Sequence, residues 1–227
     1  MKALFDHINN LINQNDNNHL KIMHDAIIKN KFNKILEFGV DRGTSTAAFL
    51  LASEKLNVKV FSIDIKDCSQ IIKHKNWNFF QSNDLNKEKI FEKFPELKKG
   101  IDFLYIDSYH EPNHIRKLLE IYFPHVNNKG HIYVDDTSSY PYRKINSLTN
   151  SITSDLTREA VEEFYFSNNH SMEYFFNGNE NGLCILIKKS QFSDKINPNN
   201  IWKYNFFFYQ IFKFIKKIKY YIKFKLN

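Results

Sequence analysis

The sequence predicts an α/β fold built on a mostly parallel sheet, and three patterns agree on this. Short apolar runs of strand length alternate with stretches of helical periodicity through the middle of the chain. Gly, Asp and Ser gather where several of these runs end, as they do at turns. Two late apolar runs flank the turn-rich segment 177–182 and predict a closing antiparallel hairpin. Strands separated by helices are typical of βαβ units, whose sheet is covered on both faces.

The predicted elements divide the chain into three parts. Residues 1–32 form an N-terminal helical segment, in which the Asn-rich stretch 13–18 separates two helices. Residues 33–190 form the α/β domain, and residues 201–227 form a C-terminal amphipathic helix after an Asn/Pro linker. Within the domain, the predicted strands are 34–38, 58–63, 77–81, 101–106, 130–134, 172–176 and 183–188, and the predicted helices are 45–56, 71–74, 87–94, 114–123 and 157–166.

The composition fits one domain with an appendage. Of the 227 residues, 42% are hydrophobic, which is enough to fill one core. The two cysteines, Cys68 and Cys184, lie far apart and make no disulfide framework, as is typical of a reduced, cytoplasmic protein. The N-terminus lacks the features of a signal peptide, and no continuous apolar run is long enough to predict a transmembrane helix.

The positive charge of the chain belongs to its C-terminal segment. The formal net charge is +7, from 32 basic and 25 acidic residues. Residues 201–227 carry seven lysines and no acid, so the basic and acidic residues of the rest of the chain balance. A neutral domain offers no basic groove, which argues against nucleic acid as a partner.

The segment 201–227 interleaves its lysines with aromatic and aliphatic residues. On a helical wheel many apolar residues share one face and several lysines lie opposite, which is the pattern of a helix that lies on the surface of a membrane, here its inner face. A helix that packs on its own domain, or on a second copy of the chain in a homo-oligomer, explains the same pattern equally well. Peripheral membrane contact and these two alternatives all remain open.

The first candidate site follows the first predicted strand. Glu37 precedes Gly39 and Gly43, whose backbones permit a tight turn and the close approach of a ligand. Thr44 and Ser45 then open a helix whose free N–H groups can meet a carboxylate or a ribose. The glycine spacing is neither that of dinucleotide-binding loops nor that of phosphate loops. A tight turn with Glu37 in a salt bridge is the simpler alternative.

Two acidic residues follow the second and third predicted strands. Asp64 lies 21 residues after Gly43, and an acid at about this distance commonly binds ribose hydroxyls. Asp84 is in a position to accept a hydrogen bond from an adenine amino group. Each of these two aspartates would also serve as a helix N-cap, which is the alternative to a role in ligand binding.

Carboxylates converge at the ends of the fourth and fifth predicted strands. Asp107 ends the fourth strand, His110 follows three residues later, and Asp135 and Asp136 end the fifth. The carboxyl ends of parallel strands form the site in open α/β sheets. Three uncompensated carboxylates must hold a proton or bind a cation, and oxygen ligands suit Mg²⁺ or Mn²⁺. An imidazole there can remove a proton from a hydroxyl. Loop capping by the aspartates and packing of His110 are the alternatives.

The order of these motifs resembles the class I S-adenosylmethionine (SAM)-dependent methyltransferases, which share a Rossmann-like fold. The resemblance extends from about residue 34 to residue 142. It points most closely to the metal-dependent sugar O-methyltransferases of the macrocin and mycinamicin type, and the cephalosporin-hydroxylase-type methyltransferases are also similar. In these families strand four often reads DGDH, of which this chain keeps Asp107 and His110 and lacks the acid between them. Strand five often ends HD, whereas here the pair Asp135-Asp136 matches the metal-binding members.

The resemblance implies a site for SAM and for Mg²⁺. Glu37, Gly39, Gly43, Thr44, Ser45, Asp64, Asp84 and Asp107 would bind SAM, and Asp107, Asp135 and Asp136 would bind the metal. His110 would be the general base, with Asp107 beside it. We further expect Tyr109, Tyr140, Tyr142 and Arg143 to contact the acceptor, because aromatic planes stack on sugar rings and Arg143 can hold a carboxylate or phosphate. His114, His125 and His131 show no paired ligand spacing with cysteines, and we expect them on helix surfaces or in loops.

The expected function is therefore SAM-dependent O-methylation of a sugar or glycan, such as a surface polysaccharide or a natural-product glycoside. A methyltransferase that acts on a non-sugar small molecule is one alternative. A non-catalytic SAM-binding or membrane-associated module is another, and it predicts a broken carboxylate cluster, whereas Asp107, His110, Asp135 and Asp136 are all present. A nicotinamide-dependent oxidoreductase predicts the loop GxGxxG, which this sequence lacks.

Overall fold

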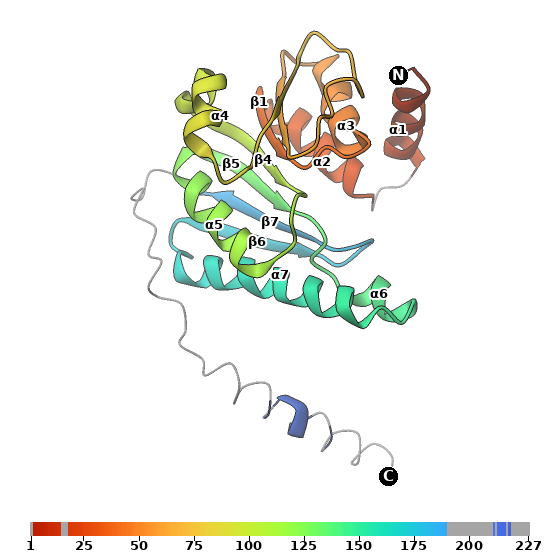
Figure 1. Ribbon diagram of the computed structural model, residues 1–227, viewed down its shortest axis with the longest axis vertical. Helices are drawn as coiled ribbons and strands as arrows, with labels where there is room; N and C mark the ends of the chain where they lie inside the picture. Colours follow the sequence, from red (N-terminus) through yellow and green to blue (C-terminus); the bar gives the residue numbers. More distant parts are fainter. Residues whose placement is uncertain (1, 15–17, 190–210, 212, 217, 219–227) are drawn as a thin grey trace.

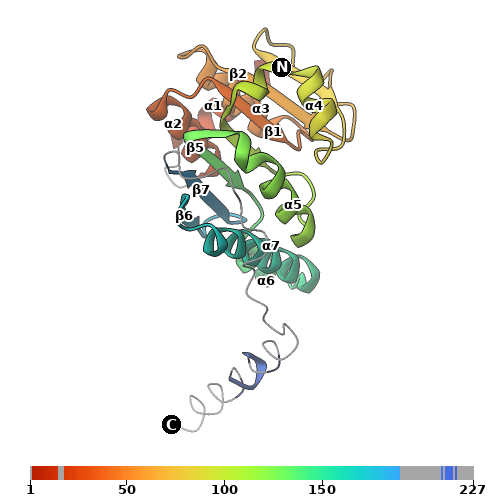
Figure 2. The same cartoon turned by 90° about the vertical axis from the view of Figure 1, so that its left-hand side faces the viewer.

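The computed structural model describes residues 2–14, 18–189, 211, 213–216 and 218. Figure 1 shows a central sheet with helices on both faces. One face is covered by α1 (Lys2–Gln14), α2 (His19–Asn30) and α3 (Thr44–Ser53), which share a buried apolar cluster with that side of the sheet. The other face is covered by α4 (Lys87–Lys93), α5 (Pro112–Tyr122) and α7 (Leu148–Ser167), with a second cluster. Figure 2 shows the same layers from the side.

The sheet has the predicted mixed topology. Its strands are β1 (Lys34–Phe38), β2 (Lys59–Asp64), β3 (Trp77–Gln81), β4 (Ile101–Ile106), β5 (Val126–Val134), β6 (Met172–Asn177) and β7 (Leu183–Lys188). They lie in the order β3-β2-β1-β4-β5-β7-β6. The first five strands are parallel, and β7 is antiparallel to both of its neighbours. The predicted α/β class, parallel sheet and closing antiparallel hairpin are confirmed.

Several bounds differ from the sequence prediction. No helix forms at residues 71–74, where the chain between β2 and β3 runs through turns held by the side chains of Asp64 and Asp67. Four residues are too few to nucleate a helix without a cap. The helix predicted at 157–166 begins earlier, at Leu148. Its first turns were not predicted because they bury Ser151 and Ser154, so the sequence there shows no apolar periodicity. Three short helices, Pro95–Lys99, Phe123–His125 and α6 (Tyr140–Lys144), were not predicted.

The strand order reverses between β1 and β4, and a glycine permits their ends to meet. Gly39 has a φ of +90°, and a Cβ built on it would lie 2.1 Å from the carbonyl oxygen of Asp107. No other residue type fits this contact. The crevice beyond such a reversal is where ligands bind in open α/β sheets, so this contact places the ends of β1 and β4 at one site.

Most of the predicted C-terminal helix lies outside the described residues. Within it, residues 211, 213–216 and 218 are helical, and Ile211, Phe214, Ile215 and Ile218 are exposed. Lys213 Nζ lies 3.6 Å from Glu159 Oε1 of α7. Among the described residues, no helix combines the length and apolarity needed to cross a membrane.

We expect Gly39→Ala to lower the free energy of unfolding by about 2 kcal/mol or more, since the new Cβ would overlap the Asp107 backbone in a left-handed conformation. Urea unfolding measures this loss. Gly178→Ala is the matched control, because its Cβ would meet the Phe176 ring at an ordinary 3.4 Å. Equal losses in the two variants would contradict the close approach of β1 and β4.

Candidate active site

Glu37 lies beneath the glycine loop in a fully buried hydrogen-bond network. It is 0% exposed, and it accepts hydrogen bonds from the hydroxyls of Ser45 (2.6 Å), Thr46 (2.7 Å) and Ser62 (2.5 Å). Burial raises the pKa of Glu37 to about 7, although the three hydroxyls work against this rise. Its carboxyl group ties β1 and β2 to the start of α3. The structure thus places Glu37 in support of the loop and away from the cavity wall.

A cavity of about 450 Å³ opens above the carboxyl ends of β1 to β4. Its walls come from the carboxyl ends of these four strands and the segments that follow them, as expected for a ligand crevice at the reversal of strand order. Five of the predicted site residues line it: Gly39, Asp64, Asp84, Asp107 and Tyr109. Gly43 and Thr44 begin α3 beside this loop, where Gly43 is buried and Thr44 exposed.

Asp64 organises the glycine loop from the end of β2. Its Oδ2 accepts hydrogen bonds from the backbone N–H groups of Val40 (2.8 Å) and Asp41 (3.3 Å), and its Oδ1 accepts one from Lys66 N (2.8 Å). Burial alone would raise the pKa of Asp64, but these backbone hydrogen bonds lower it below the ordinary value. Asp64 is therefore an ionised acceptor on the cavity wall, a position that suits its predicted contact with ribose hydroxyls.

Asp84 is held by two side chains that follow β4. Ser108 Oγ donates to Asp84 Oδ2 at 2.6 Å, and His114 Nε2 lies 2.9 Å from the same oxygen. His114 lies on α5, as expected, and lines the cavity there. The expectation is wrong for His131, which is buried within β5, where its ring packs against Phe32. His125 ends a short helix, and its ring packs edge-on against Phe91.

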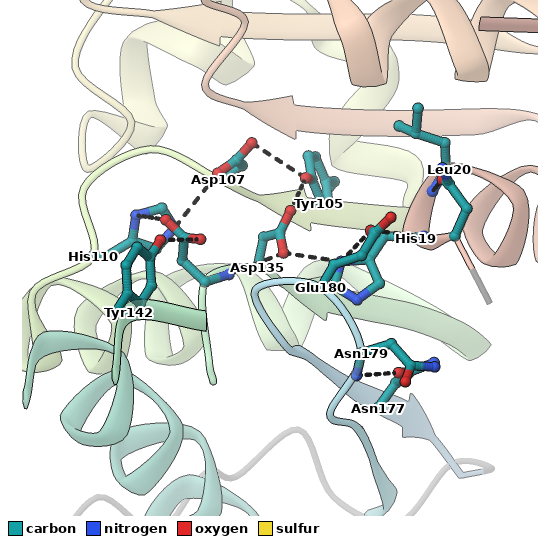
Figure 3. A network of polar contacts seen from close by, with 12 residues as sticks. His19, Leu20, Tyr105, Asp107, His110, Asp135, Tyr142, Asn177, Asn179 and Glu180 are labelled. Atoms are coloured by element: carbon teal, nitrogen blue, oxygen red, sulfur yellow. Dashed lines mark hydrogen bonds and ion pairs between the residues drawn. The ribbon is translucent and has the colours of Figure 1, made fainter. Parts of the chain in front are cut away.

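Asp107 and Asp135 lie close together at the ends of β4 and β5 (Figure 3), and the charge of Asp136 also acts on Asp107, so the three carboxylates converge as predicted. The hydroxyl of Tyr105 links two of them, at 2.7 Å from Asp135 Oδ2 and 3.2 Å from Asp107 Oδ2. Burial and the charges of Asp135 and Asp136 raise the pKa of Asp107 well above its usual range. Burial acts on Asp135 in the same sense, but hydrogen bonds from His19 and Tyr105 lower its pKa. Asp107 is thus the carboxyl group that holds a proton most readily.

His110 lies between two of these carboxylates. Its Nε2 is 3.5 Å from Asp107 Oδ1, and its Nδ1 is 3.5 Å from Asp136 Oδ2. The Nε2 atom is buried and lacks a hydrogen-bond partner within the described part of the chain. Tyr142 donates from its hydroxyl to Asp136 Oδ1 at 3.0 Å. The imidazole is therefore placed to exchange a proton with a group that enters beside Asp107.

The predicted acceptor residues do not all reach this point. Tyr142 does, whereas Tyr140 is 61% exposed and carries the Lys144 ammonium over its ring at 4.5 Å. Arg143 forms an ion pair with Asp155 of α7 at 2.9 Å, in a separate hollow at the start of that helix. Tyr109 lines the cavity above the sheet, where its ring meets His114 edge-on.

The carboxylates fit a divalent cation in donor type. Oxygen ligands from two adjacent strand ends are what Mg²⁺ and Mn²⁺ prefer, and the raised pKa of Asp107 reflects negative charge that a cation would offset. In the part of the chain that the structure describes, no group of three His, Cys, Asp or Glu side chains stands at metal-binding spacing. The identity and number of the metal ligands therefore remain predictions.

Several residues of this site were not predicted from the sequence. Tyr105 sits two residues before Asp107 on the same strand, so strand alternation could have placed it on the side of the carboxylates. Ser108 and His114 belong to the segment that follows β4, which also signals a position near the site. His19 contacts Asp135 from α2, and Glu180 contacts His19 from the turn between β6 and β7. No local motif marks these two residues.

Residues 36–137 match the family model of a methyltransferase domain. This part of the chain is therefore similar to methyltransferase domains. The match spans β1 to β5 and includes the glycine loop, Asp64, Asp84, Asp107 and Asp135. No curated protein sequence matches the chain.

Solved structures with the same fold include O-methyltransferases. A putative caffeoyl-CoA O-methyltransferase from Staphylococcus aureus has a TM-score of 0.59 at 21% identity, over 74% of this chain and 82% of that one. An O-methyltransferase from Bacillus cereus, in complex with S-adenosylhomocysteine (SAH), has a TM-score of 0.58 at 13% identity, over 82% and 91%. MycE of mycinamycin biosynthesis, in complex with Mg and SAH, has a TM-score of 0.53 at 16% identity, over 80% of this chain and 50% of that one. The fold of this chain is that of the class I SAM-dependent methyltransferases.

The buried carboxyl group of Glu37 predicts a stability that depends on pH. The pKa of Glu37 is about 7 in the folded domain and 4.5 ordinarily. Its contribution to the free energy of unfolding is therefore fully present below about pH 4.5 and is lost as the pH rises to about 7. We expect the wild type to lose up to about 3 kcal/mol over this interval relative to Glu37→Gln, which cannot ionise. Urea unfolding between pH 5 and pH 8 measures the difference.

The control for this measurement is Glu173→Gln, at an exposed position on β6. It should follow the wild type at every pH. Parallel pH profiles for the wild type and Glu37→Gln would contradict a protonated Glu37 in the folded domain.

Proposed function

We propose that the protein is a SAM-dependent O-methyltransferase that transfers a methyl group to a hydroxyl of a sugar or glycan with the help of Mg²⁺. One observation carries this proposal. His110 lies 3.5 Å from both Asp107 and Asp136, beside the wall of a cavity that carries the ribose-type acid Asp64. A general base and a carboxylate cluster thus adjoin a cavity at the place where this fold binds its ligands.

The residues of the chain divide the work of the proposed reaction. Asp64 and Asp84 hold the two ends of the adenosine part of SAM, and the loop from Gly39 to Gly43 lets the amino-acid part approach the start of α3. His110 removes the proton of the acceptor hydroxyl, and the oxygen then attacks the methyl carbon as the bond from that carbon to sulfur breaks. SAH and the methyl ether are the products. Tight placement of oxygen and methyl carbon supplies much of the acceleration.

Asp107, Asp135 and Asp136 are the residues that would hold Mg²⁺. The bound ion would act as a Lewis acid that lowers the pKa of the acceptor hydroxyl. Tyr105 and Tyr142 hold these carboxylates by hydrogen bonds, so they keep the site in shape.

The proposed sugar acceptor rests on the aromatic residues near the carboxylates. Tyr142 contacts Asp136, and Tyr109, on the wall of the adjoining cavity, is 65% exposed, so aromatic surfaces that can stack on a sugar ring adjoin the carboxylates. A MycE structure that contains Mg, SAH and Mycinamycin VI has the same fold, which supports this acceptor class by likeness. A methyltransferase for a non-sugar hydroxyl is the second candidate, favoured by the likeness to a putative caffeoyl-CoA O-methyltransferase.

Calorimetry tests the cofactor. We expect the full chain to bind SAM and SAH, and to show no heat with NAD. The chain is then incubated with isotopically labelled SAM and a panel of glycans and phenolic diols, and the products are analysed by mass spectrometry. We expect one acceptor to gain one methyl group, and we expect no methyl transfer when EDTA has removed divalent ions. If the chain does not bind SAM, the proposed function is wrong. If methyl transfer is unchanged in EDTA, the proposed role of Mg²⁺ is wrong.

His110→Asn should lower kcat by about 10²- to 10⁴-fold, because the acceptor hydroxyl loses its base. The affinity for SAH, measured by calorimetry, should stay within about twofold, since His110 is not among the residues that line the cofactor cavity. His7→Asn, at an exposed position of α1, is the control. A His110→Asn enzyme with the kcat of the control would rule out this base.

A further inference from the structure

His19 begins α2, yet its side chain lies beside the carboxylates at the end of the sheet (Figure 3). Its Nδ1 is 3.3 Å from Asp135 Oδ1 and 3.4 Å from Glu180 Oε2, and the residue is only 4% exposed. A ring nitrogen that faces two carboxylate oxygens must carry a hydrogen, because a lone pair there would be repelled by both. His19 is therefore a donor that points at Asp135.

Glu180, in the turn between β6 and β7, contacts the same ring nitrogen of His19 as Asp135 does. Its Oε2 also accepts a hydrogen bond from the backbone N–H of His19, at 3.1 Å. This N–H belongs to the first turn of α2, where the free N–H groups and the helix dipole favour a carboxylate. One oxygen of Glu180 thus fixes both the start of α2 and the ring of its first residue.

The turn that carries Glu180 also clamps the segment after Asp135-Asp136. Thr137 N donates to Gly182 O at 3.1 Å, and Ser138 N donates to Asn181 O at 2.6 Å. Gly182 has a φ of +81°, and a Cβ on it would lie 2.4 Å from Ser138 N, so the turn lies directly against this segment. The turn, the segment after β5 and α2 are therefore tied together around Asp135.

The carboxylate of Asp135 is fixed by three donors. Tyr105 bonds its Oδ2, the backbone N–H of Asp136 bonds its Oδ1 at 2.9 Å, and His19 approaches Oδ1 from α2. Tyr105 and Asp136 belong to β4 and to the segment after β5, next to the carboxylates in the sheet. His19 is the donor that comes from the N-terminal segment, outside the part of the chain that matches the family model.

We propose that His19 is a positioning residue, which orients the carboxylate of Asp135 for a divalent cation, and that Glu180 holds His19 in place. The inference rests on the metal-assisted transfer of the proposed function. Carboxylates that bind metals are commonly oriented by hydrogen bonds from residues around them, and loss of such a partner typically costs about 10- to 100-fold in affinity for the metal. On this proposal, α2 of the N-terminal segment contributes a residue to the metal site.

The experiment measures binding of Mn²⁺ alone to the full chain, by electron paramagnetic resonance and calorimetry, without an acceptor. His19→Leu fills the space and removes the donor, and it should weaken Mn²⁺ binding by about 10-fold or more. His19→Asn keeps an N–H near the position of Nδ1 and should stay within about threefold of the wild type. Glu180→Ala, at a partly exposed position, should weaken Mn²⁺ binding by an intermediate factor and is not expected to unfold the chain.

His24→Leu is the matched control. His24 is a second buried histidine of α2, and its Nδ1 contacts Asp25 of the same helix. A general loosening of α2 would lower Mn²⁺ affinity equally in His24→Leu and His19→Leu. The affinity for SAH should remain within about twofold in every variant, because neither histidine lines the cofactor cavity.

The outcomes separate the two proposals. Unchanged Mn²⁺ binding in His19→Leu, equal losses in His19→Asn and His19→Leu, or equal losses in His24→Leu would each overturn the role of His19. If His19→Leu fails to fold, Glu180→Ala decides, and wild-type affinity in that variant overturns the inference. A wild type that binds SAH and no Mn²⁺ overturns it while SAM-dependent transfer stands. A wild type that binds Mn²⁺ and no SAH removes the proposed function, and the variants still test His19.

Discussion

The concentration of negative charge at the ends of β4 and β5 is the constraint on which the rest of the site depends. Because the two strands are parallel neighbours, they deliver Asp107 and Asp135 to the same edge of the sheet. The repulsion among the carboxylates has to be offset for the domain to fold. Two imidazoles and two phenols contact the carboxylates. They are His19 of α2, Tyr105 of β4, His110 before α5 and Tyr142 of α6. Charge balance thus brings distant parts of the chain to one point.

The parallel sheet could be predicted because its strands are continuous apolar runs bounded by polar turns. β1, β3 and β4 have the predicted bounds for this reason. The start of α7 could not be predicted, since Ser151 and Ser154 fill its buried face and small polar residues leave no apolar period. The apolar pair Ile71-Ile72 suggested a helix, yet it packs against Gly43 from a loop. Periodicity reports burial, and a loop can bury apolar side chains as well as a helix can.

The candidate site divides in the same way. Residues that directly follow strands could be predicted, because topology alone brings the ends of parallel strands together, as it does for Asp107 and Asp135. The role of Glu37 required the structure, since only its burial under three hydroxyls shows that it supports the loop. His19 and Glu180 are separated by 161 positions and meet only through tertiary packing, so no spacing rule reveals them.

The contact between His19 and Glu180 also joins residues that are synthesised far apart in time. The residues of a chain leave the ribosome in order during synthesis, from the N-terminus onward. Every wall of the cofactor cavity lies between Gly39 and His114, whereas the turn that holds His19 and clamps the segment after β5 is made near residue 180. A nascent chain thus carries all the residues that line the cavity long before the turn that holds His19 against Asp135. A chain cut short in this interval would have the residues of the cavity wall and lack the turn that holds His19.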